Sequence, residues 1–139
     1  MAVVTDILSG LLMAWFSLLF IGINRFCGRV KWKDRDAWQY ILLECMLILY
    51  FIGSLKRWYF VIPIMAFLFP VWDFLQFRAH WLSWITGASD ERLRRYDDAF
   101  GDNVYLLPKS DRRTVPDAYH TVQHVLMALN TLAVFAMLR

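Results

Sequence analysis

Four long apolar runs constrain the fold of this 139-residue chain more than any other feature of its sequence. They cover residues 7–23, 37–55, 58–77 and 118–138. An α-helix needs about 20 mostly apolar residues to cross the roughly 30 Å hydrocarbon core of a bilayer. The second run carries only Glu44 as a charged residue, the third only Asp73, and the other two carry none. The pattern therefore predicts four membrane-spanning helices.

The composition agrees with a membrane protein. Hydrophobic residues make up 59% of the chain and aromatic residues 17%, with a mean hydropathy of +0.41, which is too apolar for an ordinary soluble domain of this length. We therefore expect an all-α integral membrane protein, a four-helix transmembrane bundle that forms a single membrane domain over residues 1–139. The first run lacks a basic segment before it, so we expect it to remain as a helix and not to be a cleaved signal peptide.

Lysine and arginine are distributed unevenly along the predicted spans. Twelve of the 15 lie in the segments 24–36 and 78–117, and only three lie elsewhere. Because basic loops stay on the cytoplasmic side of a membrane, both segments are predicted to be cytoplasmic and both termini non-cytoplasmic. Trp81 and Trp84 then fall in the interfacial belt. No nucleic-acid-binding motif accompanies the basic charge, so we expect no nucleic-acid partner.

The segment 78–117 contains the signals of one short surface helix. Ser89 is a suitable N-cap, acidic residues follow in the first turn, and Gly101 comes after the last turn. Further on, Pro116 fits the start of the fourth span. The predicted order is therefore three spans, a cytoplasmic-side surface helix and a fourth span.

Polar residues within the predicted spans are the candidate functional residues, because an ionisable group in a membrane is costly unless it has a partner or a function. The spacing within each span places Asp73, Gln76 and His80 nearly on one face of the third helix, and Asp117, His120 and His124 on one face of the fourth. If these helices pack antiparallel, the expected pairs are Asp73 with His124, Gln76 with His120, and His80 with Asp117.

The second span adds two further candidates. Spans two and three are joined by a tight hairpin, which is expected to make them neighbours. Reflection through that hairpin puts Tyr40 level with Asp73, and Glu44 about one turn deeper. We therefore expect all the buried polar residues to converge on the cytoplasmic half of one bundle.

Three histidines from two helices can form a metal site with an open coordination position for water. His80, His120 and His124 are the predicted ligands of zinc or another transition metal, which would lower the pKa of a bound water toward about 7. Glu44 and Asp73 are the predicted catalytic carboxylates, as a base, a further ligand or an orienting group. The predicted second-shell or substrate-binding residues are Tyr40, Gln76 and Asp117. Haem is a minor alternative, and a di-metal carboxylate site fits the spacing less well.

The pattern of one histidine followed by a final-helix His-x-x-x-His is similar to that of zinc-dependent membrane amidohydrolases of the alkaline ceramidase and adiponectin receptor type. The resemblance covers His80, His120 and His124 only. Those families look like seven-helix proteins with a serine one turn before the first histidine, and this chain has Gln76 at that position. The likeness is one of site chemistry, and it implies zinc-dependent hydrolysis.

Two functions follow from these expectations. The first is a small metal-dependent hydrolase or other lipid-modifying enzyme that acts on a lipid substrate at the cytoplasmic-side interface. The second is a non-catalytic subunit or assembly factor of a larger membrane complex, with membrane-complex partners or a second copy of the chain bound to its helix faces. Under the second function, the histidines are ordinary interfacial side chains and Glu44 is a packing residue.

Overall fold

The computed structural model describes residues 2–21 and 37–139, and this part of the chain is 78% helical with no strands. Its elements are α1 (Ala2–Ile21), α2 (Ala37–Leu55), α3 (Val61–Gln76), the π-helical turn η1 (Phe77–Trp81), α4 (Leu82–Thr86), α5 (Asp90–Phe100) and α6 (Ala118–Met137). Helix α2 has the bounds of the predicted second span. The predicted surface helix is α5, whose N-cap residue Ser89 accepts a hydrogen bond from the amide of Arg92.

Three helices of the described chain are long and apolar enough to cross a membrane: Ala2–Phe20, Trp38–Leu55 and Val61–Thr86. The last of these joins α3, η1 and α4 into one continuous rod. Helix α6, the fourth predicted span, has 20 residues but is not among the three. It carries four polar side chains, two imidazoles and two amides, that lower its mean hydropathy: His120, Gln123, His124 and Asn130.

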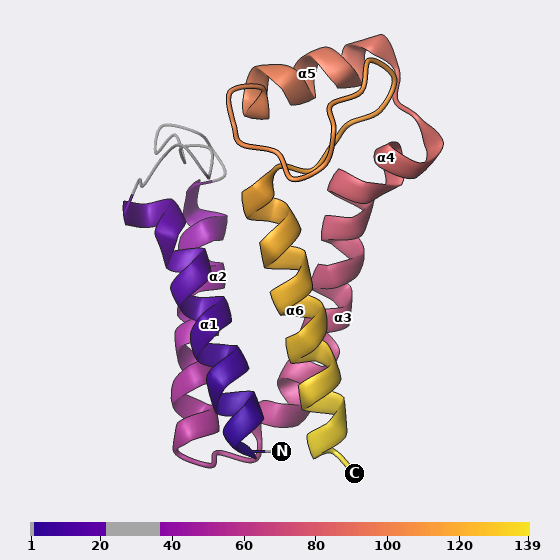
Figure 1. The fold of residues 1–139 in the computed structure, drawn as a ribbon. Coiled ribbons are helices and arrows are strands. Elements are labelled where there is room, and N and C mark those ends of the chain that lie inside the picture. Colours follow the sequence, from indigo (N-terminus) through magenta and orange to yellow (C-terminus); the bar gives the residue numbers. More distant parts are fainter. Residues whose placement is uncertain (1, 22–36) are drawn as a thin grey trace.

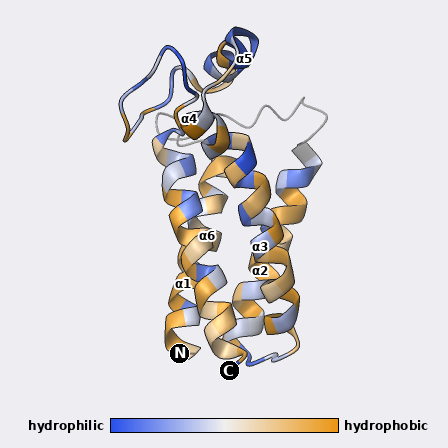
Figure 2. Ribbon diagram, turned by 90° about the vertical axis from the view of Figure 1, so that its right-hand side faces the viewer, coloured by the Kyte–Doolittle hydropathy of each residue, from blue (hydrophilic) through white to orange (hydrophobic). Residues whose placement is uncertain are grey.

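The four long helices lie side by side (Figure 1). Helix α1 packs against α2 on one side and α6 on the other, and α3 packs against α6 and less extensively against α2. Both ends of the described chain lie at the end where α2 turns into α3, and α5 lies at the opposite end with the connection 101–117. Figure 2 shows that the long helices are mainly hydrophobic, whereas α5 and much of this connection are hydrophilic.

Aromatic side chains fill much of the space between the helices. Tyr50 of α2 meets Phe69 of α3 edge to face at a ring-centroid distance of 5.1 Å, and Phe16 of α1 meets Trp72 of α3 at 5.9 Å. Such pairs contribute about 0.5–1.5 kcal/mol each beyond the area that they bury. Fully buried aliphatic residues complete this core: Leu12, Leu47, Met127 and Val134.

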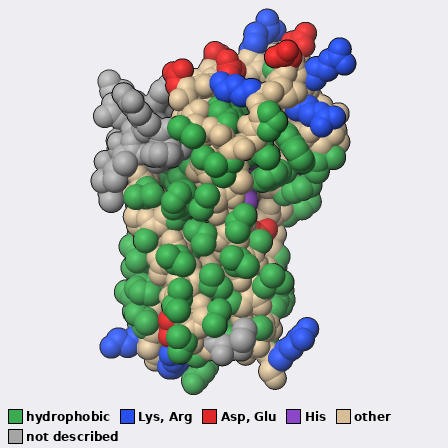
Figure 3. Space-filling model, in the orientation of Figure 1, with side chains coloured by type: hydrophobic (Ala, Val, Ile, Leu, Met, Phe, Trp, Pro, Cys, Tyr) green, Lys and Arg blue, Asp and Glu red, His purple; other side chains and the backbone are tan. Residues whose placement is uncertain are grey.

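The outer faces of the helices are also hydrophobic. Large apolar side chains such as Val3, Phe67 and Leu132 are each about two-thirds exposed, and Figure 3 shows hydrophobic side chains over the middle of the molecule, with charged groups at its two ends. Soluble monomers rarely expose apolar surface on this scale. This distribution is typical of a protein surrounded by lipid.

An ion pair fixes the end of the molecule where α2 turns into α3. Arg57 adopts a left-handed backbone conformation with φ of 59°, and its guanidinium donates to both carboxylate oxygens of Asp6 at 2.8 Å. This contact raises the pKa of Arg57. Ser54 donates to the same carboxylate at 2.5 Å. The turn between α2 and α3 is therefore attached to the start of α1.

Candidate functional site

The three histidines of the chain come together between η1 and α6. The ring centroid of His80 lies 4.2 Å from that of His120 and 5.4 Å from that of His124, and His120 and His124 are 6.2 Å apart. His80 is buried, and the other two are half-buried. His80 thus forms one cluster with two histidines that lie 40 or more positions later in the sequence, at the α5 end of the molecule.

His80 is carried by the π-helical turn η1. The amide of Leu82 donates to the carbonyl of Phe77, five residues earlier, where an α-helix would use the fourth. A single π turn inside a helix is frequently found at a functional site, because it changes the direction in which nearby side chains point. Here both His80 and the adjacent Trp81 contact histidines of α6.

Each histidine is held at its Nδ1 atom by a different side chain. The partner of His80 is the hydroxyl of Tyr96 at 2.9 Å, that of His120 is the carboxylate of Asp117 at 2.7 Å, and that of His124 is the indole nitrogen of Trp81 at 2.6 Å. A hydrogen bond at one ring nitrogen fixes the orientation of an imidazole and influences which nitrogen carries the proton. The cluster is therefore oriented by an outer layer of polar groups.

Asp117 serves α6 and the cluster together. It is completely buried, caps the helix by accepting from the amide of His120 at 2.8 Å, and accepts from the amide group of Asn103 at 2.5 Å. Burial acts to raise the pKa of Asp117, but the hydrogen bonds and charge of His120, together with Asn103, outweigh it and lower the pKa below its usual range. The side chain is therefore a carboxylate at neutral pH.

One face of α5 covers the cluster. Arg92, Tyr96 and Phe100 follow one another at four-residue intervals and so lie on the same side of that helix. The guanidinium of Arg92 donates to the carbonyl of Ala79 in η1 at 3.0 Å, and the ring of Phe100 lies 5.0 Å from that of His120. Burial, and then the charge of Asp117, raise the pKa of Tyr96, which keeps its hydroxyl protonated.

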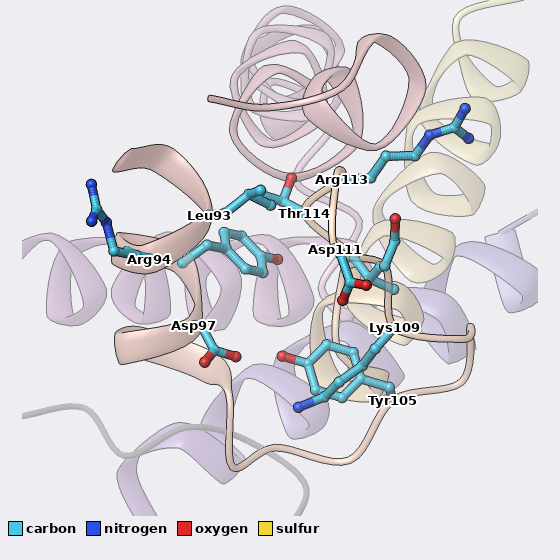
Figure 4. Close-up of a pocket in the computed structure, with 11 residues that line it drawn as sticks. Leu93, Arg94, Asp97, Tyr105, Lys109, Asp111, Arg113 and Thr114 are labelled. Carbon is cyan, nitrogen blue, oxygen red and sulfur yellow. The ribbon is translucent and has the colours of Figure 1, made fainter. Parts of the chain in front are cut away.

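A hollow with a volume of about 300 Å³ lies between α5 and the connection 101–117, beside the histidine cluster. Figure 4 shows the carboxylates of Asp97 and Asp111 turned toward it and the guanidinium groups of Arg94 and Arg113 extending outward. Tyr96 lines this hollow and also contacts His80. Tyr96 therefore links this hollow to the histidine cluster.

The register of α3 against α6 differs from the sequence-based expectation by about one turn or more. Gln76 was expected beside His120, but its side-chain oxygen lies 3.4 Å from Nε2 of His124. Asp73 was expected beside His124, but it accepts a hydrogen bond at 2.6 Å from Thr131, which lies deeper along α6. The axial shift of two antiparallel helices is set by the packing of their side chains, which is not visible in the spacing of polar residues.

Glu44 and Tyr40 lie apart from the histidines. Helices α2 and α6 each pack against α1 and α3, and in the described part of the chain α2 does not pack against α6 or η1. Glu44 instead pairs with Ser17 of α1 at 2.5 Å, and the ring of Tyr40 packs against that of Phe16. The expectation that these two residues join the cluster rested on the tight hairpin, which makes α2 adjacent to α3 in sequence but does not bring it to α6.

The imidazoles are stacked rather than arranged around a point. The planes of His80 and His120 are inclined by 26°, and residues 2–21 and 37–139 contain no group of three or more His, Cys, Asp or Glu side chains placed to hold a metal ion. A metal needs ring nitrogens that converge in the ring planes at about 2.0–2.1 Å. Metal binding therefore requires the rings to turn from their present positions.

Several neighbours of the cluster were not identified from the sequence. Trp81 was assigned to the interfacial belt, and Arg92, Tyr96 and Phe100 to a solvent-exposed helix. Their four-residue spacing in α5 was the one available signal. Asn103 gave no signal, because its role depends on the path of the connection 101–117.

Comparison of the chain with protein-family models, with curated proteins and with solved structures gave no match. The geometry of the cluster is therefore the basis for inferring a function.

Proposed function

We propose that this chain is a small multi-pass membrane protein, a four-helix transmembrane bundle with both termini on the non-cytoplasmic side. Three long apolar helices and the exposed apolar side chains around them support membrane insertion. The polar residues of α6 support its place as a fourth span, because Gln123 and Asn130 are buried against the other helices and not exposed to the surroundings. The uneven distribution of lysine and arginine supports the orientation.

The function that the geometry favours is metal-dependent hydrolysis at the cytoplasmic-side interface. The observation that carries this proposal is the convergence of all three histidines, from two helices, within 6.2 Å. His80, His120 and His124 would hold zinc or another transition metal after a change of ring orientation. Asp117 would fix His120 in the manner of the carboxylates that orient metal-bound histidines.

A hydrolase that acts on a lipid needs access for the lipid and for water, and the histidine cluster could be reached from two sides. Figure 3 shows a histidine and, below it, an acidic side chain at the surface of the apolar face, surrounded by hydrophobic side chains. A lipid substrate would reach the cluster from this side. Water would approach through the polar hollow behind Tyr96. Asp73 lies seven residues from His80 along the same rod and would interact with the part of the substrate within the membrane.

Metal analysis of the detergent-purified wild-type protein tests this proposal. After incubation with zinc and removal of unbound ions, we expect one equivalent of metal per chain by atomic emission. The cobalt-substituted protein should show the visible absorption of a four- or five-coordinate histidine site. Folded protein that retains no metal at micromolar concentrations of zinc would contradict the proposal.

A non-catalytic subunit is the second candidate, and a groove between α2 and α3 favours it. The groove has a volume of about 280 Å³, and its lining includes Leu49, Trp58, Ile64 and Leu68 and is entirely apolar. A transmembrane helix of a partner protein, or of a second copy of this chain, would fit a surface of this kind. A metal-free protein that is equally stable when all three histidines are replaced would favour this function over the hydrolase.

A further inference from the structure

We propose that the hollow between α5 and the connection 101–117 binds an amino-alcohol phosphate, in which an ammonium group and a phosphate group are joined by a short chain. The ammonium would lie inside the hollow and the phosphate at its rim. This inference goes beyond the proposed hydrolase, and it needs no metal at the histidines. It rests on the charged, aromatic and hydroxyl groups that form the walls of the hollow.

The two walls of the hollow supply the same three kinds of side chain, a tyrosine, an aspartate and an arginine. These are Tyr96, Asp97 and Arg94 from α5, and Tyr105, Asp111 and Arg113 from the connection. The volume of about 300 Å³ is at the lower end of the range for ligand pockets, which suits a small molecule or a headgroup. Because Asp97 and Asp111 are exposed, a ligand can enter from the solvent.

The charged groups of the hollow are unpaired and separated by sign. Figure 4 shows the carboxylates of Asp97 and Asp111 turned toward the hollow and the guanidinium groups of Arg94 and Arg113 extending outward. Within residues 2–21 and 37–139, none of these four groups forms an ion pair. A cation is therefore favoured inside and an anion at the rim. A ligand that carries both charges satisfies both positions, whereas a purely anionic ligand would be repelled by the carboxylates.

The two tyrosines of the hollow present their rings to a ligand, because their hydroxyl groups already have partners. The hydroxyl of Tyr105 donates to the carbonyl of Phe100 at 2.9 Å, and that of Tyr96 lies 2.9 Å from Nδ1 of His80. The face of an aromatic ring attracts an ammonium group through its quadrupole. Aromatic rings beside carboxylates are therefore suited to an organic cation.

An ammonium group of the chain itself already lies against one of these rings. Nζ of Lys109 is 4.7 Å from the ring centroid of Tyr105, and it donates to the carbonyl of Gly101 at 2.7 Å. Held by these contacts, Lys109 forms no ion pair with Asp97 or Asp111 in the described part of the chain. Two carboxylates and one ammonium leave one negative charge inside the hollow, which the ammonium of a ligand would balance.

A buried hydroxyl in the wall is independent support for a polar ligand. Thr114 lines the hollow and is 2% exposed, and its Oγ1 has no hydrogen-bond partner among the residues that the structure describes. Buried hydroxyl groups ordinarily have a partner, which is an ordered water or a ligand where the protein supplies none. A phosphate ester bound in the hollow would supply an acceptor for this hydroxyl.

Calorimetric titration of phosphoethanolamine into the protein, purified in an uncharged maltoside detergent, tests the inference. Phosphoethanolamine should bind at least about fivefold more tightly than ethanolamine or inorganic phosphate, because its two charged groups act together. Binding no tighter than that of either component alone would overturn the inference, since one half of the hollow would then contribute nothing. Absence of binding to the folded protein would overturn it as well.

Neighbouring residues of α5 provide matched variants and controls. Asp97→Asn should weaken the binding of phosphoethanolamine about threefold, the effect of one exposed charge contact, and should not weaken that of inorganic phosphate. Arg94→Gln should weaken the binding of both compounds about threefold. Asp98→Asn and Arg95→Gln, which lie outside the lining of the hollow, should behave like the wild type. All four side chains are exposed, so the helical content should not change. Equal effects at lining and control positions would overturn the inference.

A lipid-binding measurement distinguishes the two sources of such a ligand. The hollow lies at the α5 end of the bundle (Figure 1), where the group is available as a lipid headgroup or as a free compound. In nanodiscs of phosphatidylglycerol with added phosphatidylethanolamine, native mass spectrometry identifies the lipid that the protein retains. Preferential retention of phosphatidylethanolamine, and its loss in Asp97→Asn combined with Asp111→Asn, would assign the headgroup. Equal retention of both lipids with binding of free phosphoethanolamine would assign the soluble compound.

Neither readout involves the histidines, so failure of this inference is separate from failure of the proposed hydrolase. A protein that binds zinc but shows no preference in either assay would overturn the inference alone. A protein that binds phosphoethanolamine but no zinc would support the inference and contradict the hydrolase.

Discussion

Replacing His120 with alanine is expected to weaken zinc binding by more than about 100-fold, because loss of an orienting partner of a metal ligand alone costs about 10- to 100-fold. His120 stacks on His80 at 4.2 Å, lies 6.2 Å from His124, and is oriented by Asp117. Its removal leaves two imidazoles, which are too few for a site built from three. The dissociation constant, measured by competition with a chelator, reports the effect.

The control for this variant is Val125→Ala in the same helix, since the side chain of Val125 is 55% exposed. It should bind zinc like the wild type. Helical content measured by circular dichroism should be the same in both variants. An unchanged dissociation constant for a folded His120→Ala protein would show that the histidines do not bind the metal.

Substitutions at Asp117 are expected to separate metal binding from stability. Asparagine is as good an N-cap as aspartate, so Asp117→Asn should leave the free energy of unfolding within a few tenths of a kcal/mol, provided that the amide of Asn103 turns to present its oxygen. The same change removes the negative charge that orients His120 and should weaken zinc binding about 10- to 100-fold. Asp117→Ala should show the same weakening and also lose about 1 kcal/mol of stability.

Acid titration provides a further check on Asp117. Because folding lowers the pKa of this carboxyl, its stabilising contribution is present above the unfolded pKa of about 4 and is lost as the pH falls through the lower folded value. The wild type should therefore lose stability over this interval by an amount that is absent from Asp117→Asn. Equal zinc affinities in Asp117→Asn and the wild type would contradict the orienting role of the carboxylate.

The local features of this fold could be predicted from the sequence because they depend on neighbouring residues. The bounds of α2 follow from an apolar run with Glu44 as its only charged residue, and those of α5 from Ser89 at its start and Gly101 at its end. The four-residue spacing of His120 and His124 places both on one side of α6 without knowledge of the fold. These inferences need only helix geometry and capping.

The features that sequence reasoning missed depend on which helices are neighbours and on their axial register. Glu44 was assigned to the cluster because the hairpin correctly makes α2 a neighbour of α3, but α2 does not pack against α6, where two of the histidines lie. The π turn has no signal in the sequence, although it changes the position of His80 and Trp81 relative to α6. Tyr96 was missed because nothing in the surface helix shows that one of its faces covers a buried site.

The packing of α3 against α6 is the claim on which the whole account depends, and disulfide formation between paired cysteines tests it most directly. In a chain with Cys27 and Cys45 replaced by serine, Asp73→Cys combined with Thr131→Cys should cross-link readily on mild oxidation in membranes, since the native side chains are 2.6 Å apart. Asp73→Cys combined with His124→Cys should remain uncrosslinked, because it represents the register one to two turns away. Cross-linking of the second pair and not the first would contradict the account, since Gln76 would then no longer meet His124 and the histidines would not form this cluster.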